Sequence, residues 1–157
     1  MEIIVVVLII GVISGFAMIR YDNDLPESRL YANARSIASL IQAAHTKSMS
    51  KGTIIKMEID LENAVFSLNP WTGKLGRVEC PEQISILEFT TASGVEEDDD
   101  ELHDIEFNPQ GVNSSLIISI SNENEQTVSI VFNALIGTTS IHDGLYEEQW
   151  LEDVPRF

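Results

Sequence analysis

The chain of 157 residues contains a single cysteine, Cys80, so no disulfide bond can form within it. Its second half is almost without bases: from Val78 onward there are eighteen acids and one base, Arg156, and the formal net charge of the whole chain is −16. Such an acidic surface repels phosphates. We therefore expect no nucleic acid among the partners of this protein.

Catalytic and nucleotide-binding motifs are also missing. The sequence has no G-x-S-x-G, no Walker loop, no G-x-G-x-x-G and no H-E-x-x-H pattern. Its histidines, His45, His103 and His142, do not stand at metal-ligand spacing. His103 and Asp104 lie near the acidic run in sequence, but adjacent polar residues in a loop meet by chance. We expect no enzyme activity, no catalytic residue and no cofactor or metal site.

One acidic run leaves a question about calcium open. Residues 96–101 are all Glu or Asp, and dense carboxylates can collect Ca²⁺, which takes six to eight oxygen ligands. The spacing does not fit an EF-hand loop. The alternative interpretation is a solvated loop that is held open by its own charge repulsion.

The most distinctive segment is the first nineteen residues. Glu2 stands at the head of an unbroken apolar run from Ile3 to Ile19, which ends at Arg20. Seventeen helical residues span about 25 Å, somewhat less than the ~30 Å of a bilayer core. Gly11 and Gly15 form a G-x-x-x-G pair, a spacing that permits close helix packing in membranes. An acid at this boundary predicts either a charge-pairing role or a simple end to the span.

A second helix is predicted to follow. Asp24 suits a helix cap, Pro26 suits the first turn and a bend after the apolar segment, and Gly52 suits a stop. An apolar stripe recurs at three- and four-residue steps through Leu30, Ala34, Ile37, Ile41 and Ala44. We expect this stripe to pack on the domain that follows.

The rest of the chain has the short alternating pattern of antiparallel strands. Strands are expected at 53–60, 64–68, 84–89, 105–107, 116–121, 127–132 and 138–142, with loops at 69–76 and 93–104. In the first strand we expect Ile55, Met57 and Ile59 to point inward. Trp71, Trp150 and the tail aromatics Tyr146 and Phe157 are expected to pack on the domain or on a neighbouring subunit.

Together these patterns predict an α+β fold. Its long N-terminal helix, with a membrane-spanning half and an amphipathic half, packs on a small antiparallel β-sheet domain. The expected divisions are a hydrophobic transmembrane helix at 1–20, an amphipathic helix at 21–52, a β head at 53–142 and an acidic tail at 143–157.

The segment EIIVVVLIIGVISG resembles the N-terminal segment of type IV pilins and type II secretion pseudopilins, with Glu2 at the position of the family's glutamate. Ala43-Ala44, Lys51-Gly52, the motif at 107–111 (Phe-Asn-Pro-Gln-Gly) and Ile136-Gly137 are similar to features of the H-type minor pseudopilins and related minor pilins (GspH/FimT-like). The family's frequent Arg after the final Gly is Thr138 here.

This resemblance implies a structural protein: a minor pseudopilin of a type II secretion system, with a prepilin-type N-terminal methylation motif. It would sit in the bacterial inner membrane with a single pass through residues 3–19 and its head in the periplasm. Its implied partners are other pilins or pseudopilins, in contact through Glu2, and an inner-membrane assembly platform. Prepilin peptidase is a partner only if a basic leader precedes Met1, and we expect one in the upstream DNA.

Two alternatives remain open at the level of sequence. One is a minor pilin that primes a type IV pilus for adhesion, motility or DNA uptake. The other is a membrane-anchored periplasmic binding module unrelated to fibres. The absence of a cysteine pair favours a minor subunit over the disulfide-looped major pilins.

Overall fold

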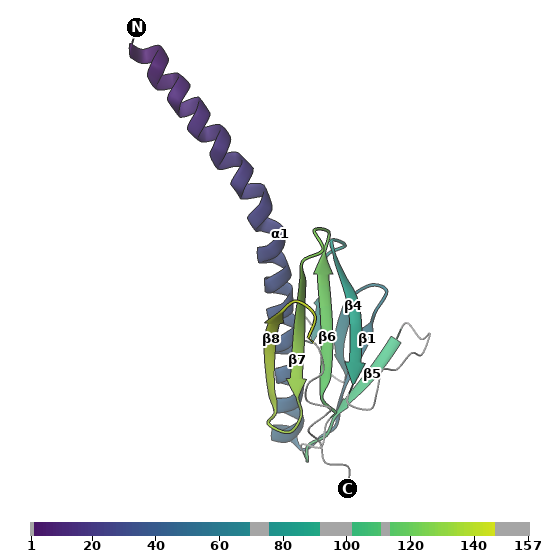
Figure 1. Ribbon diagram of the computed structural model, residues 1–157. Helices are drawn as coiled ribbons and strands as arrows, with labels where there is room; N and C mark the ends of the chain where they lie inside the picture. Colours follow the sequence, from purple (N-terminus) through teal and green to yellow (C-terminus); the bar gives the residue numbers. More distant parts are fainter. Residues whose placement is uncertain (1, 70–75, 92–101, 111–113, 147–157) are drawn as a thin grey trace.

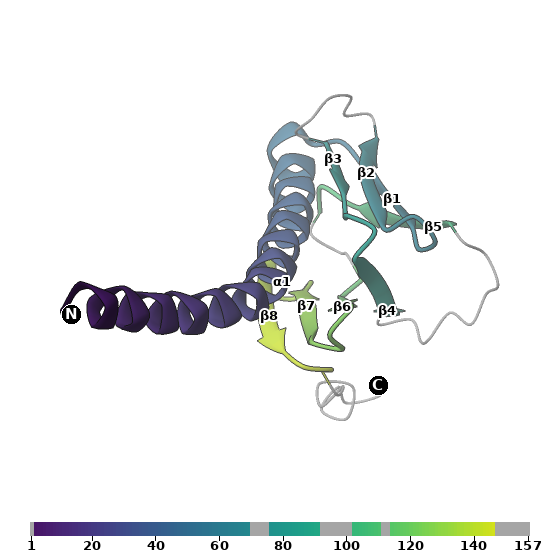
Figure 2. The ribbon, with the colours of Figure 1, turned by 90° about the horizontal axis from the view of Figure 1, so that it is seen from above.

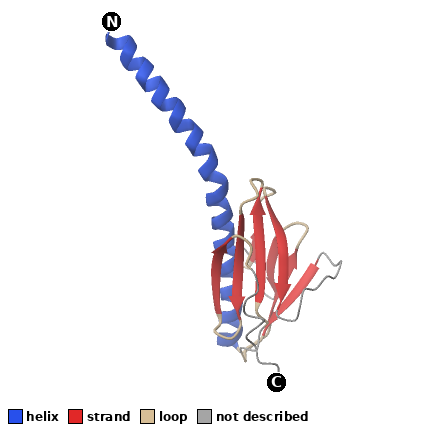
Figure 3. Cartoon of the chain, viewed as in Figure 1, coloured by secondary structure: helices blue, strands red, loops and turns tan. Residues whose placement is uncertain are grey.

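The computed structural model describes residues 2–69, 76–91, 102–110 and 114–146, with the side chains of Glu2 and of residues 12–25 outside that description. One helix, α1 (Glu2–Lys51), forms the whole N-terminal third. Its first half projects away from the β domain, and its second half lies along that domain (Figures 1 and 3). The chain is therefore an antiparallel β head with a projecting helical stem, which is the first half of α1.

The helix start that the sequence predicts at Asp24 is wrong. The backbone is helical on both sides of this residue, and Pro26 lies inside α1. Proline removes one backbone hydrogen bond and crowds the carbonyl four residues earlier, which bends a helix without necessarily ending it. Figure 2 shows the helix changing direction before it runs along the head. The expected bend is present, but it joins two parts of one helix.

The strands form two four-stranded sheets in which every neighbouring pair is antiparallel. Sheet A has the order β3 (Arg77–Glu79), β2 (Val65–Asn69), β1 (Ile55–Asp60) and β5 (Leu102–Phe107). Sheet B has the order β4 (Ile84–Thr91), β6 (Leu116–Asn122), β7 (Thr127–Asn133) and β8 (Thr138–Asp143). The α+β fold class is thus confirmed, and the β domain is divided between two sheets.

Seven of the eight strands fall within a few residues of where the sequence pattern predicts them. The exception is β3, a three-residue strand for which the sequence pattern made no prediction. The predicted loop at 93–104 is wrong at its end, because residues 102–104 already belong to β5. In β5 the alternation of exposed and buried side chains begins at Leu102. The acidic residues around Leu102 made this alternation hard to recognise in the sequence.

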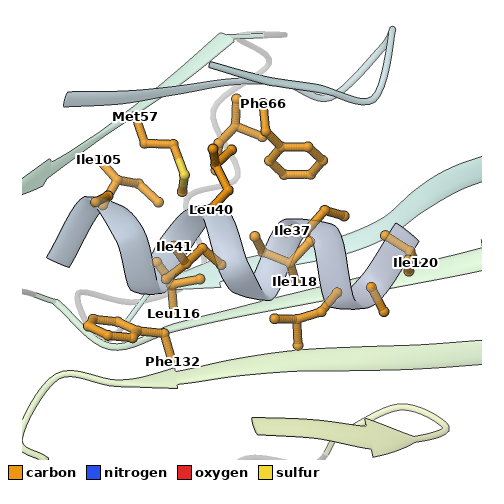
Figure 4. Close-up of a cluster of buried hydrophobic side chains, with 14 of the residues drawn as sticks. Ile37, Leu40, Ile41, Met57, Phe66, Ile105, Leu116, Ile118, Ile120 and Phe132 are labelled. Atoms are coloured by element: carbon orange, nitrogen blue, oxygen red, sulfur yellow. The ribbon is translucent and has the colours of Figure 1, made fainter. Parts of the chain in front are cut away.

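The core lies where the second half of α1 meets both sheets. The apolar stripe of the helix is completely buried, as predicted, and so are the inward side chains of β1. Figure 4 shows Ile37 and Ile41 of the helix among Met57 and Ile105 from sheet A and Phe132 from sheet B. One helix therefore supplies apolar contacts to both sheets at once.

The outer side of sheet B carries buried serines next to two buried apolar residues, Ile117 and Val131. The hydroxyls of Ser119 and Ser129 lie 2.9 Å apart across β6 and β7, and both residues are fully buried. After β8 the chain turns back: the Gly144 N–H donates to the Thr127 carbonyl, and the Tyr146 N–H donates to the Ser129 hydroxyl. Small hydroxyl side chains let this returning segment lie close to the strand while its polar groups stay satisfied.

Two glycines fix the end of the helix and its contact with sheet B. Gly52, at a φ of 64°, follows the last helical residue and donates its N–H to the Ser48 carbonyl at 3.0 Å. Gly137, in the β7–β8 turn, has a φ of 66° and accepts a hydrogen bond from the Gln42 amide through its carbonyl. A Cβ on Gly137 would lie 2.5 Å from Nε2 of His45. The turn is thus pressed against the helix.

Substitution of Gly137 tests how tightly this turn and the helix are packed. Gly137→Ala adds a methyl group that meets the buried His45 ring, in a backbone conformation that alanine disfavours. Gly144→Ala is the matched control, because its φ is 79° and nothing lies within 4 Å of an added Cβ. We expect a loss of about 1–2 kcal/mol of unfolding free energy from the control. Gly137→Ala should lose a further 1–3 kcal/mol or so from overpacking.

Urea denaturation of the full chain, followed by circular dichroism, gives both values. Equal losses in the two variants would show that the His45 ring moves aside freely and that the turn is not tightly packed on the helix.

Candidate assembly surface

The first half of α1 presents a long apolar surface with no partner inside the described part of the chain. Eight consecutive apolar side chains, from Ile3 to Ile10, are between 50% and 79% exposed. Monomeric soluble proteins rarely expose a continuous apolar surface of this kind, and such patches mark contacts with other proteins or with membranes. This surface is the strongest functional feature of the structure.

The residue expected to mediate subunit assembly, Glu2, and the pair expected to mediate membrane helix packing, Gly11 and Gly15, lie along this stem. Gly11 is exposed, and a Cβ added to it would meet nothing within 4 Å, so a second helix could approach closely there. Glu2 begins α1, and Gly15 lies within it, but their side-chain surroundings fall outside the described residues. Within the part of the chain that the structure describes, no helix is both long and apolar enough to cross a membrane.

The histidines are separated by the fold. His45 packs edge-on against Phe132, with 5.4 Å between ring centroids, and His103 packs on Phe89 at 5.2 Å. His142 lies on β8, where its Nε2 is 2.9 Å from the Ser140 hydroxyl. Two of the three rings are therefore buried packing residues.

The structure does not assemble His103 and Asp104 into a site. Successive residues of β5 point to opposite faces, so His103 is buried while Asp104 is exposed. Among the described residues, no group of three His, Cys, Asp or Glu side chains is placed to hold a metal ion. The acidic run at 96–101, Trp71, Trp150 and Phe157 lie outside the described residues.

One pocket of about 250 Å³ lies at the neck, where the helix leaves the head. It is lined by residues of the helix, of the segment before and into β4, and of the β6–β7 turn: Pro26, Arg29, Pro81, Gln83, Ile84, Asn122, Glu123 and Asn124. Asn122 is occupied with its own turn, since its Oδ1 accepts the N–H groups of Asn124 and Gln126. No nucleophile with an adjacent base is found among these lining residues, so the pocket gives no support to a catalytic role.

Cys80 is chemically shielded. Its side chain is buried beside the core, and burial raises the pKa of the thiol to about 11. The thiolate is the reactive form, so this cysteine is a packing residue and not a nucleophile.

The structure also shows a second exposed helix surface that the sequence analysis missed. On the second half of α1, small residues recur on the side away from the core stripe, at Ser28, Ala32, Ser36, Ser39, Ala43, Thr46 and Ser50. We call this surface the small-residue face. The same three- and four-residue period that located the core stripe would have located it.

The sequence and the fold of this chain differ in how far they resemble known proteins. No protein-family model matches the sequence, and no curated protein matches it either. Among solved structures, the chain is similar to the minor pseudopilin EpsH from the type 2 secretion system of Vibrio cholerae, with a TM-score of 0.57 and 11% sequence identity. The match covers 73% of this chain and 97% of that one. The likeness shows the fold: a pilin-like arrangement of a long helix on antiparallel sheets.

The environment of Cys80 predicts slow chemical modification in the folded protein. At pH 8 the native thiol, with a pKa of about 11, is almost entirely protonated, whereas a thiol in the unfolded chain is several per cent ionised or more. We expect alkylation by iodoacetamide to be at least ~100-fold slower in buffer than in 6 M guanidinium. Mass spectrometry of timed samples measures this ratio, and comparable rates in both solvents would contradict the buried position.

Proposed function

We propose that this chain is a structural minor subunit of a pilin-like fibre, most closely an H-type minor pseudopilin of a type II secretion system. The observation that carries the proposal is the stem: an apolar helix surface at Ile3–Ile10 that the chain's own head leaves uncovered. The likeness of the fold to a minor pseudopilin supports it. In this proposal the stem enters a bundle of similar helices, and the head faces outward.

The size of the exposed surface favours a bundle over a simple pair. Burying eight partly exposed aliphatic side chains gains on the order of 10 kcal/mol, at about 1.5–3 kcal/mol for each full burial. Association itself costs roughly 4–15 kcal/mol. One neighbour covers only one side of a helix, so a single contact would barely offset this cost. Several surrounding helices, or lipid, would cover the stem completely.

Glu2 has a specific role in this proposal. A carboxylate inside an apolar bundle is costly unless a positive group neutralises it, and the free amine of a neighbouring subunit is compact enough to do so. Glu2 would then set the register between subunits, and Gly11 and Gly15 would allow close helix approach. Before assembly the stem would lie in the bacterial inner membrane with the head in the periplasm.

The proposed role requires no enzyme activity and no cofactor in this chain. Its partners would be other pilins or pseudopilins of the same fibre and an inner-membrane assembly platform. Prepilin peptidase would act on it only if a leader precedes Met1. A minor pilin that primes a type IV pilus uses the same assembly principle and differs in the system it serves, which the neighbouring genes would indicate.

Replacement of Glu2 separates a fibre subunit from a merely anchored domain. In Glu2→Ala, we expect the chain to remain in the membrane fraction while its recovery in sheared fibres falls by at least tenfold, because the charge partner between subunits is lost. Glu27→Gln is the matched control, since Glu27 is an exposed carboxylate on the same helix near the head. The control should assemble like the native protein.

Immunoblots of sheared-fibre and membrane fractions from a strain lacking the native gene measure both pools. Unchanged fibre recovery in Glu2→Ala, or no fibre-associated native protein at all, would contradict the proposed function.

A further inference from the structure

The pocket at the neck, which we call the neck pocket, has two walls that the fold holds in place. Asn122 fixes the β6–β7 turn: its Oδ1 accepts the N–H groups of Asn124 and Gln126, and its amide donates to the Gln126 side chain at 2.7 Å. In the segment before β4, the Ile84 N–H donates to the Pro81 carbonyl at 2.9 Å. Both walls are therefore formed before a ligand arrives, which lowers the cost of binding.

Opposite charges line the neck pocket without meeting. Arg29 lies on the helix wall and Glu123 on the turn wall, and both residues are exposed. Among the described residues, neither has a partner within ion-pair distance. Gln83 and Asn124 belong to the same lining, and no hydrogen bond within the described ranges occupies their side-chain amides. The pocket thus offers one cation, one anion and two amides to a ligand.

These groups match a small zwitterion that carries a phosphate and an ammonium. A guanidinium and amide N–H groups donate to phosphate oxygens, and a carboxylate accepts N–H bonds from a primary ammonium. The pocket volume is about 250 Å³. At roughly 30 Å³ for each water-sized group, this space holds about eight non-hydrogen atoms. A phosphoethanolamine group is of this size.

The lining disfavours the two other common kinds of lipid headgroup. A choline headgroup has no N–H to donate, and proteins bind its quaternary ammonium on aromatic faces. No lining residue of the neck pocket is aromatic. Glu27, Glu82 and Glu125 are exposed beside the lining, so a headgroup with a net negative charge would be repelled.

The neck pocket lies at the end of the head from which the stem leaves. Figure 1 shows the β6–β7 turn and the start of β4 at this end. The apolar run ends at Ile19, and Pro26 follows seven residues later, about 10 Å further along a helix. The headgroup layer of one leaflet is roughly 5–8 Å thick. The long side chain of Arg29 covers the remaining few ångströms, as basic side chains do at membrane surfaces.

We propose that the neck pocket binds the phosphoethanolamine headgroup of a membrane lipid. The phosphate would lie between Arg29 and the amides of Gln83 and Asn124. The ammonium would contact Glu123. This inference rests on the proposed function, because the stem must lie in the membrane for the pocket to reach the lipid.

The site would be weak but occupied. Ion pairs between exposed groups contribute little, so a single headgroup would not be held tightly. The stem, however, keeps the pocket at the lipid surface, where headgroups are present at a high effective concentration. The contact would hold the head in one orientation on the membrane, and assembly into a fibre would break it.

Titration of the full chain in detergent micelles tests the proposal. The probes are short-chain phospholipids with ethanolamine, choline or glycerol headgroups, and the readout is the NMR shift of the Gln83 and Asn124 side-chain amides. We expect saturable shifts with the ethanolamine lipid and at least fivefold weaker binding of the other two. Equal binding of all three lipids would overturn the proposal, since it would show that the pocket does not recognise the headgroup.

Two substitutions test the charged groups of the site. Arg29→Gln and Glu123→Gln each remove one charge and should each weaken binding of the ethanolamine lipid at least fivefold. Arg35→Gln and Glu125→Gln are the matched controls, because both residues are exposed, lie on the same helix and turn, and stand outside the lining. Unchanged backbone amide shifts in the core would show that each variant is folded. Equal losses in the controls would reduce the effect to general charge and overturn the site.

Glycerophosphoethanolamine, a soluble compound with the same headgroup, distinguishes a lipid from a free ligand. The micelle-bound lipid should reach half-saturation at a concentration at least tenfold lower, because the lipid and the stem share one micelle. Equal half-saturation concentrations would overturn the membrane source of the ligand.

Recovery of the native chain in sheared fibres separates this inference from the proposed function. Native protein in fibres without selective binding of the ethanolamine lipid would overturn the headgroup site and leave the fibre role intact. Selective binding by a chain that never enters fibres would contradict the fibre role and support the headgroup site. Absence of both would overturn both.

Discussion

The packing of one apolar helix stripe against two sheets is the constraint on which the rest of the structure depends. Leu30, Ile37 and Ile41 are fully buried, and they meet side chains from both sheets in a single core. Within the described ranges, neither four-stranded sheet has another helix to cover its inner face. Because the head folds around the second half of α1, the direction of the first half is set by the core.

Periodicity made much of this fold predictable. The core stripe of α1 and the inward residues of β1 follow directly from their three-to-four and two-residue repeats, and both are confirmed. The strand β3 could not be found in this way, since three residues are too few to show alternation. The helix start predicted from Asp24 and Pro26 was wrong because capping preferences concern only a few neighbouring residues. The continuous helix is maintained by hydrogen bonds on both sides of the proline.

The candidate surfaces were predictable to different degrees. The apolar stem was evident from composition, because eight large aliphatic side chains in succession have few alternatives to burial. The arrangement of charges on the head depends on register: that Glu58 faces Asp104 follows from the pairing of β1 with β5, strands separated by more than forty residues. No local pattern encodes that pairing. Sequence therefore indicates what can be buried, and the fold indicates which charges meet.

The continuity of α1 has a mechanical consequence. Each residue of a helix advances about 1.5 Å and turns about 100° around the helix axis. The number of residues between the stem and the head therefore fixes the rotation of the head relative to the stem. An insertion of a single residue between Ile10 and Leu30 would swing the head by about 100° relative to the stem. Seven inserted residues would bring it back to within about 20° of its original heading. The number of residues in this segment is thus a geometric setting, and evolution can change it only in steps close to whole turns.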